Sequence, residues 1–168
     1  AHPHVAGRVA VVHNGIVENF RALRAELAAE GRVFSSETDT EVVAHAIDRA
    51  LSAGEDLAGA LAATLARLEG AYALAVIAEG APERIAVARA GSPLAVGFGE
   101  DGEEMFVGSD AIALAPFSDR IVYLEEGDHG IVSPGRLDLF DRTGRPVTRP
   151  ARSSPTQVSL AEKGNYRH

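Results

Sequence analysis

Residues 71–78, Ala-Tyr-Ala-Leu-Ala-Val-Ile-Ala, are apolar without a break and follow a glycine, Gly70. Such a run predicts a β-strand buried on both faces, because a half-buried strand would alternate apolar and polar residues. Before Gly70 the apolar residues recur at helical spacing, whereas after residue 78 short apolar runs are separated by Gly, Pro or acidic turns. Helices in the first half and strands in the second predict an α+β fold, with stacked sheets and helices outside.

Three helices are predicted upstream of this strand, each marked by a polar start or a glycine stop. In chain order the signals are a stop at Gly31, a start at Thr38 with a stop at Gly54, and a start at Asp56. The predicted strands are residues 8–13, 71–78, 85–89, 94–96, 105–107, 121–124, 130–132 and 137–140, and Ser109-Asp110 begins a short helical turn.

The chain has 168 residues, 46% hydrophobic and 24% charged, which is the composition of one globular domain. A net charge of −8 argues against nucleic acid as a partner. No apolar run is long enough to span a membrane, and no export leader is visible, so we expect a cytoplasmic location. Because the 168 residues contain no cysteine, they offer neither a disulfide nor a thiol nucleophile.

The pair Asn14-Gly15 lies in the sequence Val-Val-His-Asn-Gly-Ile of residues 11–16. One interpretation is a tight turn, since Asn-Gly is a favoured turn pair. A two-residue hairpin would need a second strand directly afterwards, but a helical pattern follows. The other interpretation is an oxyanion site, in which the Asn14 side-chain amide and the Gly15 backbone N–H donate to one oxygen. The residues alone leave both interpretations open.

Asp39 lies in the segment Ser-Glu-Thr-Asp-Thr-Glu of residues 36–41, where the second helix begins. One interpretation is that Asp39 serves only the helix start, where the dipole favours a carboxylate. The segment nevertheless carries more acceptors than one helix end requires, so a carboxylate remains for the ammonium group of a ligand. An oxyanion binder beside such an anchor suits an amide-cleaving site that recognises an amino acid.

The histidines do not predict a metal centre. His2 and His4 could offer two imidazoles, but no further ligand lies close in sequence, so a loop with exposed or locally bonded histidines is the favoured interpretation. His45 follows Glu41 by four residues and is interpreted as a helix-surface pair. His13 flanks the proposed oxyanion site and is expected to help shape it. We expect no cofactor.

The end of the chain is basic. From Arg142 onward there are six cationic residues, closing with Arg167, against the single acid Glu162. Residues 150–155 are poor in apolar residues and predict a linker or an extended crossing segment. We therefore divide the chain into residues 1–149 and a basic segment, residues 150–168, for which a solvated tail is favoured over an anion-binding role.

Several segments together resemble the class II glutamine amidotransferases, and most closely the glutaminase domains of glucosamine-6-phosphate synthases (glutamine–fructose-6-phosphate aminotransferases). The resemblance covers essentially the whole chain in order. It rests on Ala1-His2-Pro3-His4-Val5, Val12-His13-Asn14-Gly15-Ile16-Val17-Glu18-Asn19, Ser36-Glu37-Thr38-Asp39-Thr40-Glu41, Leu68-Glu69-Gly70-Ala71-Tyr72-Ala73, Ala88-Arg89-Ala90-Gly91-Ser92-Pro93-Leu94, Gly108-Ser109-Asp110-Ala111, Leu124-Glu125-Glu126-Gly127-Asp128 and Lys163-Gly164 with Tyr166-Arg167-His168.

The resemblance implies a four-layer αββα sandwich of the N-terminal-nucleophile hydrolase type. In this family an N-terminal Cys attacks the side-chain amide of glutamine, with its own α-amino group as base. Asn14 and Gly15 match the family's oxyanion hole, and Asp39 matches the residue that holds the glutamine α-amino group. The implied reaction releases ammonia from glutamine and passes it to fructose 6-phosphate to give glucosamine 6-phosphate.

The chain also departs from the family pattern. The Cys-bearing strand and the loop that grips the glutamine carboxylate have no counterpart, and Ala1 cannot act as the nucleophile. Our expectation is a segment of a longer enzyme whose absent domains bind fructose 6-phosphate, so that these residues alone are inactive and the sandwich is incomplete at its N-terminal strands. The alternative is a cysteine-free, non-catalytic binding module. We also expect a homo-oligomer.

Overall fold

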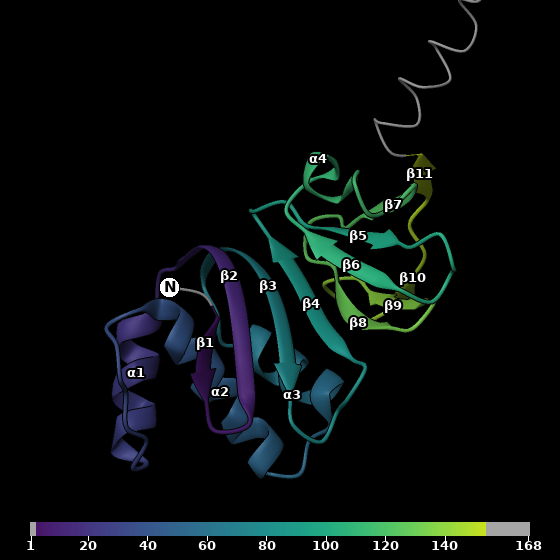
Figure 1. Cartoon of the computed structure of the whole chain (residues 1–168). Helices are drawn as coiled ribbons and strands as arrows, with labels where there is room; N and C mark the ends of the chain where they lie inside the picture. The colour runs from purple at the N-terminus through teal and green to yellow at the C-terminus, as the bar shows by residue number, and fades with distance from the viewer. Residues whose placement is uncertain (1–2, 154–168) are drawn as a thin grey trace, which may run out of the picture.

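The computed structural model describes residues 3–153 of the chain, which form two antiparallel sheets and four helices (Figure 1). The helices are α1 (Phe20–Ala29), α2 (Asp39–Ser52), α3 (Leu57–Leu65) and α4 (Ala111–Leu114). The strands are β1 (His4–Ala6), β2 (Val9–Val17), β3 (Gly70–Ala78), β4 (Ile85–Ala90), β5 (Ala95–Phe98), β6 (Met105–Gly108), β7 (Arg120–Tyr123), β8 (His129–Ser133), β9 (Arg136–Phe140), β10 (Pro146–Val147) and β11 (Ala151–Ser153).

The elements stack as four layers. The larger sheet has seven strands in the order β1-β2-β3-β4-β8-β9-β10, and the smaller has four in the order β11-β7-β5-β6. Helices α1–α3 lie on one face of the larger sheet in Figure 1, and the smaller sheet lies over the β8–β10 end of its other face. The single-turn helix α4 packs on the outer side of the smaller sheet, through Leu114 against Ile121. The predicted α+β sandwich is therefore confirmed.

Helix limits follow the local signals in the sequence. The side chain of Thr38 accepts a hydrogen bond from the backbone N–H of Glu41 at the start of α2, and Asp56 does the same for Gly59 at the start of α3. After α1 the backbone N–H of Gly31, with φ of +94°, donates to Ala28. Glycine stops and polar starts satisfy backbone groups that have no partner inside the helix, so these limits were readable from the sequence.

Strand β2 extends farther along the chain than the strand predicted at residues 8–13. It pairs along its full length with β3, from Val9 opposite Ala78 to Val17 opposite Gly70. Asn14 and Gly15 therefore lie inside a strand, opposite Ala73 and Tyr72, rather than at the end of one. The turn interpretation of Asn14-Gly15 is wrong, because the chain does not reverse there.

The larger sheet is covered unequally on the face opposite its helices. At Ala73 of β3 and Val87 of β4 that face is covered, because these two residues pack against Leu94 and Val96. Farther along, four large apolar side chains on the same face are at least 46% exposed: Val5, Val12, Ile16 and Ile77. We call these four residues the uncovered sheet face.

The uncovered sheet face corrects one expectation from the sequence. Residues 71–78 were expected to be buried on both faces, but Ala71 and Ile77 are exposed. The reason is that the smaller sheet packs on this face of β3 at Ala73, whereas Ala71 and Ile77 lie toward the two ends of the strand on the same face. An apolar run predicts what a strand can bury, not what the rest of the chain places over it.

Three short strands were not predicted. β1 contains His4, where a loop was expected, and β10 and β11 follow the last strand predicted from the sequence. β11 pairs with β7, which confirms an extended crossing segment over residues 151–153. The remainder of the segment 150–168, from residue 154 onward, lies outside the described residues.

Candidate active site

Asn14 and Gly15 lie on an open stretch of β2. β1 pairs only with Val9–Val11, so among the described residues no strand occupies that edge of β2 beyond Val11. The Asn14 side chain is exposed, and no hydrogen bond joins its amide to another described residue. An unpaired strand edge offers backbone N–H groups. This stretch can therefore present both a side-chain amide and a backbone donor to a ligand.

The backbone at Gly15 admits only glycine. Its φ is +101°, a conformation that side chains disfavour, and a Cβ built there would lie 2.1 Å from the carbonyl oxygen of Ala71. The same Cβ would also lie 2.9 Å from the Ser92 hydroxyl. The close approach of β3 and of the turn at Ser92 thus fixes the path of the backbone that carries the Gly15 N–H.

Asp39 is joined to the same strand. Its Oδ2 accepts a 2.9 Å hydrogen bond from the backbone N–H of Val17, at the end of β2, and its side chain is 22% exposed. Gly15 and Val17 are two residues apart, a rise of about 7 Å along a strand. That distance is comparable to the length of an extended glutamine, whose α-amino nitrogen and side-chain amide carbon are four bonds apart.

Besides the Val17–Asp39 bond, a second hydrogen bond, between His13 and Thr40, joins β2 to the start of α2. The imidazole of His13 is buried, and its Nδ1 lies 3.1 Å from the hydroxyl of Thr40 and 3.9 Å from Asp39 Oδ2. Because side chains alternate along a strand, His13 faces the helices while Asn14 points to the opposite face. His13 therefore contacts the start of the helix that carries Asp39, and its role in shaping the site stays a prediction.

Glu41 is buried and holds the loop that leads into α2. Only 2% exposed, its carboxylate accepts hydrogen bonds from the backbone N–H of Ser35 at 2.8 Å, the Ser36 hydroxyl at 2.6 Å and His45 Nε2 at 3.3 Å. Burial raises the pKa of the Glu41 carboxyl, but the bonds from Ser36, Ser35 and His45 together outweigh burial and lower it below the ordinary 4.5. The Glu41 carboxylate thus binds the loop that precedes α2.

The interpretation of Glu41 and His45 as a surface pair is wrong. His45 is 7% exposed, and its other ring nitrogen lies 3.3 Å from Arg32 Nη1. Arg32 also donates to Asp48 at 2.9 Å, and Asp48 accepts the backbone N–H of Arg8. The i, i+4 spacing predicted the pair correctly, but its burial by Arg32 and by the loop that precedes α2 could not be read from that spacing.

We predict that Glu41→Gln lowers stability at neutral pH by about 1–3 kcal/mol, because one buried acceptor would be lost. Since the folded pKa of Glu41 lies below its ordinary value, its stabilisation is complete above about pH 4.5 and lost as the pH falls through the folded pKa. The difference between wild type and variant should therefore shrink on acidification. Urea unfolding across a pH series measures it.

Glu37→Gln is the matched control, because the Glu37 side chain lies in the same segment and is 97% exposed. It should leave both the stability and its pH dependence nearly unchanged. Parallel pH profiles for wild type and Glu41→Gln would show that the buried carboxylate does not contribute as described.

Arg149, the cation that directly precedes the basic segment of residues 150–168, is bound within the fold. Arg149 donates from Nε and Nη2 to both oxygens of Asp128 at 2.9 Å, and Asp128 is fully buried. Glu125 adds a third contact to Arg149, also at 2.9 Å. This cation is thus part of the fold and anchors the stretch between β10 and β11.

No metal site is supported by the described residues, which contain no group of three or more His, Asp or Glu side chains suited to a metal ion. His4 lies in strand β1, 3.4 Å from the hydroxyl of Thr38, so the expectation of an exposed or locally bonded loop histidine is wrong for His4, and His2 is outside the described residues. No helix in residues 3–153 is long and apolar enough to cross a membrane.

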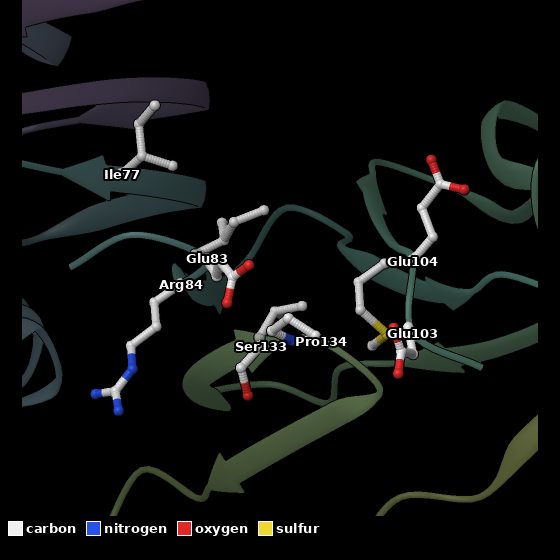
Figure 2. Close-up of a pocket in the computed structure, with 10 residues that line it drawn as sticks. Ile77, Glu83, Arg84, Glu103, Glu104, Ser133 and Pro134 are labelled. Atoms are coloured by element: carbon white, nitrogen blue, oxygen red, sulfur yellow. The ribbon is translucent and has the colours of Figure 1, made fainter. Parts of the chain in front are cut away.

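A separate cavity of about 360 Å³ lies beside the β3–β4 turn (Figure 2). Ile77, Arg84 and Glu103 are among its lining residues, and it includes none of Asn14, Gly15 and Asp39. Figure 2 shows glutamate side chains on both sides of it, from Glu83 and from Glu103 and Glu104. The candidate site is therefore an open stretch of β2 and not this cavity.

Sequence comparison identifies relatives over the whole chain. A family described as "Glutamine amidotransferase domain" matches residues 2–116. Glutamine–fructose-6-phosphate aminotransferases (isomerizing) from Caulobacter vibrioides, Brucella abortus and Zymomonas mobilis are 55%, 52% and 51% identical over all 168 residues. The chain spans 27% of the length of each of these curated relatives.

Comparison of structures agrees. A glutamine phosphoribosylpyrophosphate amidotransferase from B. subtilis superposes with a TM-score of 0.68 and 28% identity, over 80% of this chain and 29% of that one. A structure described as the allosteric regulatory enzyme of purine biosynthesis gives 0.65 and 28%, over 80% of this chain and 28% of its own. Both similarities extend through most of the described sandwich.

Proposed function

Since this chain belongs to the glutamine amidotransferase domain family, we propose that it is the glutamine-hydrolysing part of a glutamine–fructose-6-phosphate aminotransferase. The observation that carries the proposal is the 55% identity over all 168 residues to such an enzyme. The arrangement of Asn14 and Gly15 on β2, with Asp39 of α2 bonded to Val17 of the same strand, supports it. A non-catalytic binding module, the alternative from the sequence, has less support because the relatives over the whole chain are named as aminotransferases.

In this proposal the site of β2 binds glutamine in two places. The Asn14 amide and the Gly15 backbone N–H donate to the oxygen that becomes negative when a nucleophile attacks the glutamine amide carbon. The Asp39 carboxylate binds the α-ammonium group through the oxygen that does not accept from Val17. The nucleophile is a thiol from outside these residues, which contain no cysteine.

The remaining steps would take place outside this chain. The released ammonia would pass to a fructose 6-phosphate site carried by other parts of the protein. Its reaction there would give glucosamine 6-phosphate. We further propose a cytoplasmic location, because a phosphorylated sugar is charged and remains in the compartment where it is made.

Asp39→Asn in the full-length aminotransferase tests the binding role. We expect the KM for glutamine to rise about ten- to hundredfold, since a charge-assisted hydrogen bond is worth about 1.5–3 kcal/mol. Asparagine keeps an oxygen that can accept from Val17, so the fold should be unaffected. Steady-state glutaminase kinetics give KM and kcat separately.

Glu37→Gln is the control for loss of a nearby negative charge, because that carboxylate is 97% exposed and lies two residues before Asp39. Its KM should stay near the wild-type value. An unchanged KM in Asp39→Asn would remove Asp39 from substrate binding.

We also propose that the protein forms a homo-oligomer. The uncovered sheet face exposes Val5, Val12, Ile16 and Ile77 together, and the neighbouring β6 is a sheet edge. Contiguous apolar surface and an open strand edge both favour association with a second copy. Sedimentation velocity over a concentration series would detect a monomer instead.

A further inference from the structure

The Gly91-Ser92 turn lies against the candidate oxyanion site. Gly91 forms an isolated bridge with Tyr72, which is the residue paired with Gly15 in the β2–β3 ladder. A Cβ at Gly91 would lie 2.6 Å from the Ala71 side chain, and the Ser92 hydroxyl closes the space beside Gly15. Any displacement of this turn would therefore change the packing around Gly15.

Glu126 holds this turn from the other side. Both oxygens of its carboxylate lie 2.9 Å from the backbone nitrogen of Gly91, which donates to them. The carboxylate is also close to the Tyr72 phenol, whose pKa is raised first by burial and then by the charge of Glu126. Glu126 is exposed, yet both of its carboxylate oxygens accept from the one Gly91 N–H, and it lies close to β3, the strand paired with Gly15. It is therefore placed to hold the Gly91-Ser92 turn in position.

The loop that carries Glu126 is itself fastened at several points. The backbone N–H of Arg89 donates to Asp128 at 2.9 Å, and that of Gly127 donates back to Arg89 at 3.0 Å. The Arg89 guanidinium donates to the carbonyl oxygen of Leu124. On the far side Arg149 grips the buried Asp128 carboxylate with two hydrogen bonds. The loop of residues 124–128 is thus hydrogen-bonded to Arg89 on one side and to Arg149 on the other, and it carries Glu126 next to the Gly91-Ser92 turn.

We propose that Glu126 is a positioning residue of the glutaminase site, which acts through the Gly91-Ser92 turn to hold the Gly15 backbone in its donating position. This proposal rests on the function proposed above. Glu126 touches no substrate atom in it. Because the Gly15 N–H is needed mainly when negative charge develops on the oxygen, loss of positioning should lower kcat and leave KM nearly unchanged.

The test uses three variants of the full-length aminotransferase. Glu126→Ala removes the acceptor of the Gly91 N–H and should lower glutaminase kcat roughly ten- to hundredfold, since small misplacements of catalytic groups have effects of that order. Glu126→Gln keeps one carbonyl oxygen for Gly91 and should recover most of the rate. Glu125→Ala is the matched control, because Glu125 lies in the same loop, contacts Arg149 and is 64% exposed.

The outcomes separate this proposal from the function on which it rests. A normal kcat in Glu126→Ala, together with a large loss in Asn14→Ala, would overturn the positioning role and leave the function intact. A normal kcat in both variants would overturn the positioning role of Glu126 and the oxyanion role of Asn14 together, whereas a wild-type enzyme that releases no ammonia from glutamine would overturn the function. Equal losses in Glu126→Ala and Glu125→Ala would show a general effect of the loop and would also overturn the specific role of Glu126.

Discussion

Asn14→Ala in the full-length aminotransferase is expected to lower glutaminase kcat by about a hundred- to a thousandfold, with little change in KM. Removal of one oxyanion donor from an enzyme that cleaves amides typically has this effect, equivalent to about 2.7–4 kcal/mol of barrier. The split between kcat and KM follows because the oxygen carries full charge only in the transition state. Steady-state release of ammonia from glutamine measures both constants.

Val12→Ala is the control for this experiment. Val12 lies two residues before Asn14 on the same face of β2 and is 46% exposed, so truncation there changes the strand without removing a donor. It should leave kcat within a few-fold of wild type. A near-normal kcat in Asn14→Ala would exclude Asn14 as an oxyanion donor.

Gly15→Ala is expected to destabilise the protein by about 2–5 kcal/mol. A left-handed backbone costs a non-glycine residue about 1–2 kcal/mol, and forcing atoms into a packed region costs about 1–3 kcal/mol more. At Gly15 the obstruction is the Ala71 carbonyl oxygen, 2.1 Å from the new Cβ, which cannot move without shifting β3. Urea unfolding gives the free-energy change, and glutaminase activity should fall in parallel.

Gly31→Ala separates the two causes. Gly31 has a similar φ of +94°, but a Cβ there would meet nothing within 4 Å. Its cost should be only the backbone preference, about 1–2 kcal/mol. Equal losses for the two alanine variants would show that the close approach of β3 to Gly15 contributes nothing to stability.

The helical half of the fold was predictable because its signals are local. Thr38, Asp56 and Gly31 act on residues within one helical turn, and each marks the helix end that the structure has. The full length of β2 was not predictable, because Asn14 and Gly15 become strand residues only by pairing with β3, nearly 60 positions away. Propensity at an Asn-Gly pair favours a turn, and the long-range ladder overrides it.

The residues of the candidate site could be predicted from the sequence, but their arrangement in space could not. Asn14, Gly15 and Asp39 were visible as short motifs, whereas their mutual arrangement depends on the Asp39–Val17 bond between a helix and a strand. Burial of Glu41 and His45 depends on the loop of Ser35 and Ser36 folding over α2. Ser92 carries no local signal of its proximity to Gly15, since only the β2–β3–β4 order brings them together.

The alternation along β2 restricts how this segment can change in evolution. Val9, Val11 and His13 face the helices, while Asn14 points to the opposite face. Insertion or deletion of one residue between Val9 and Asn14 would exchange the two faces, either exposing the core residues or turning the amide toward α2. Exposed positions such as Val12 can accept substitutions, but the length of this segment can change only in steps of two residues.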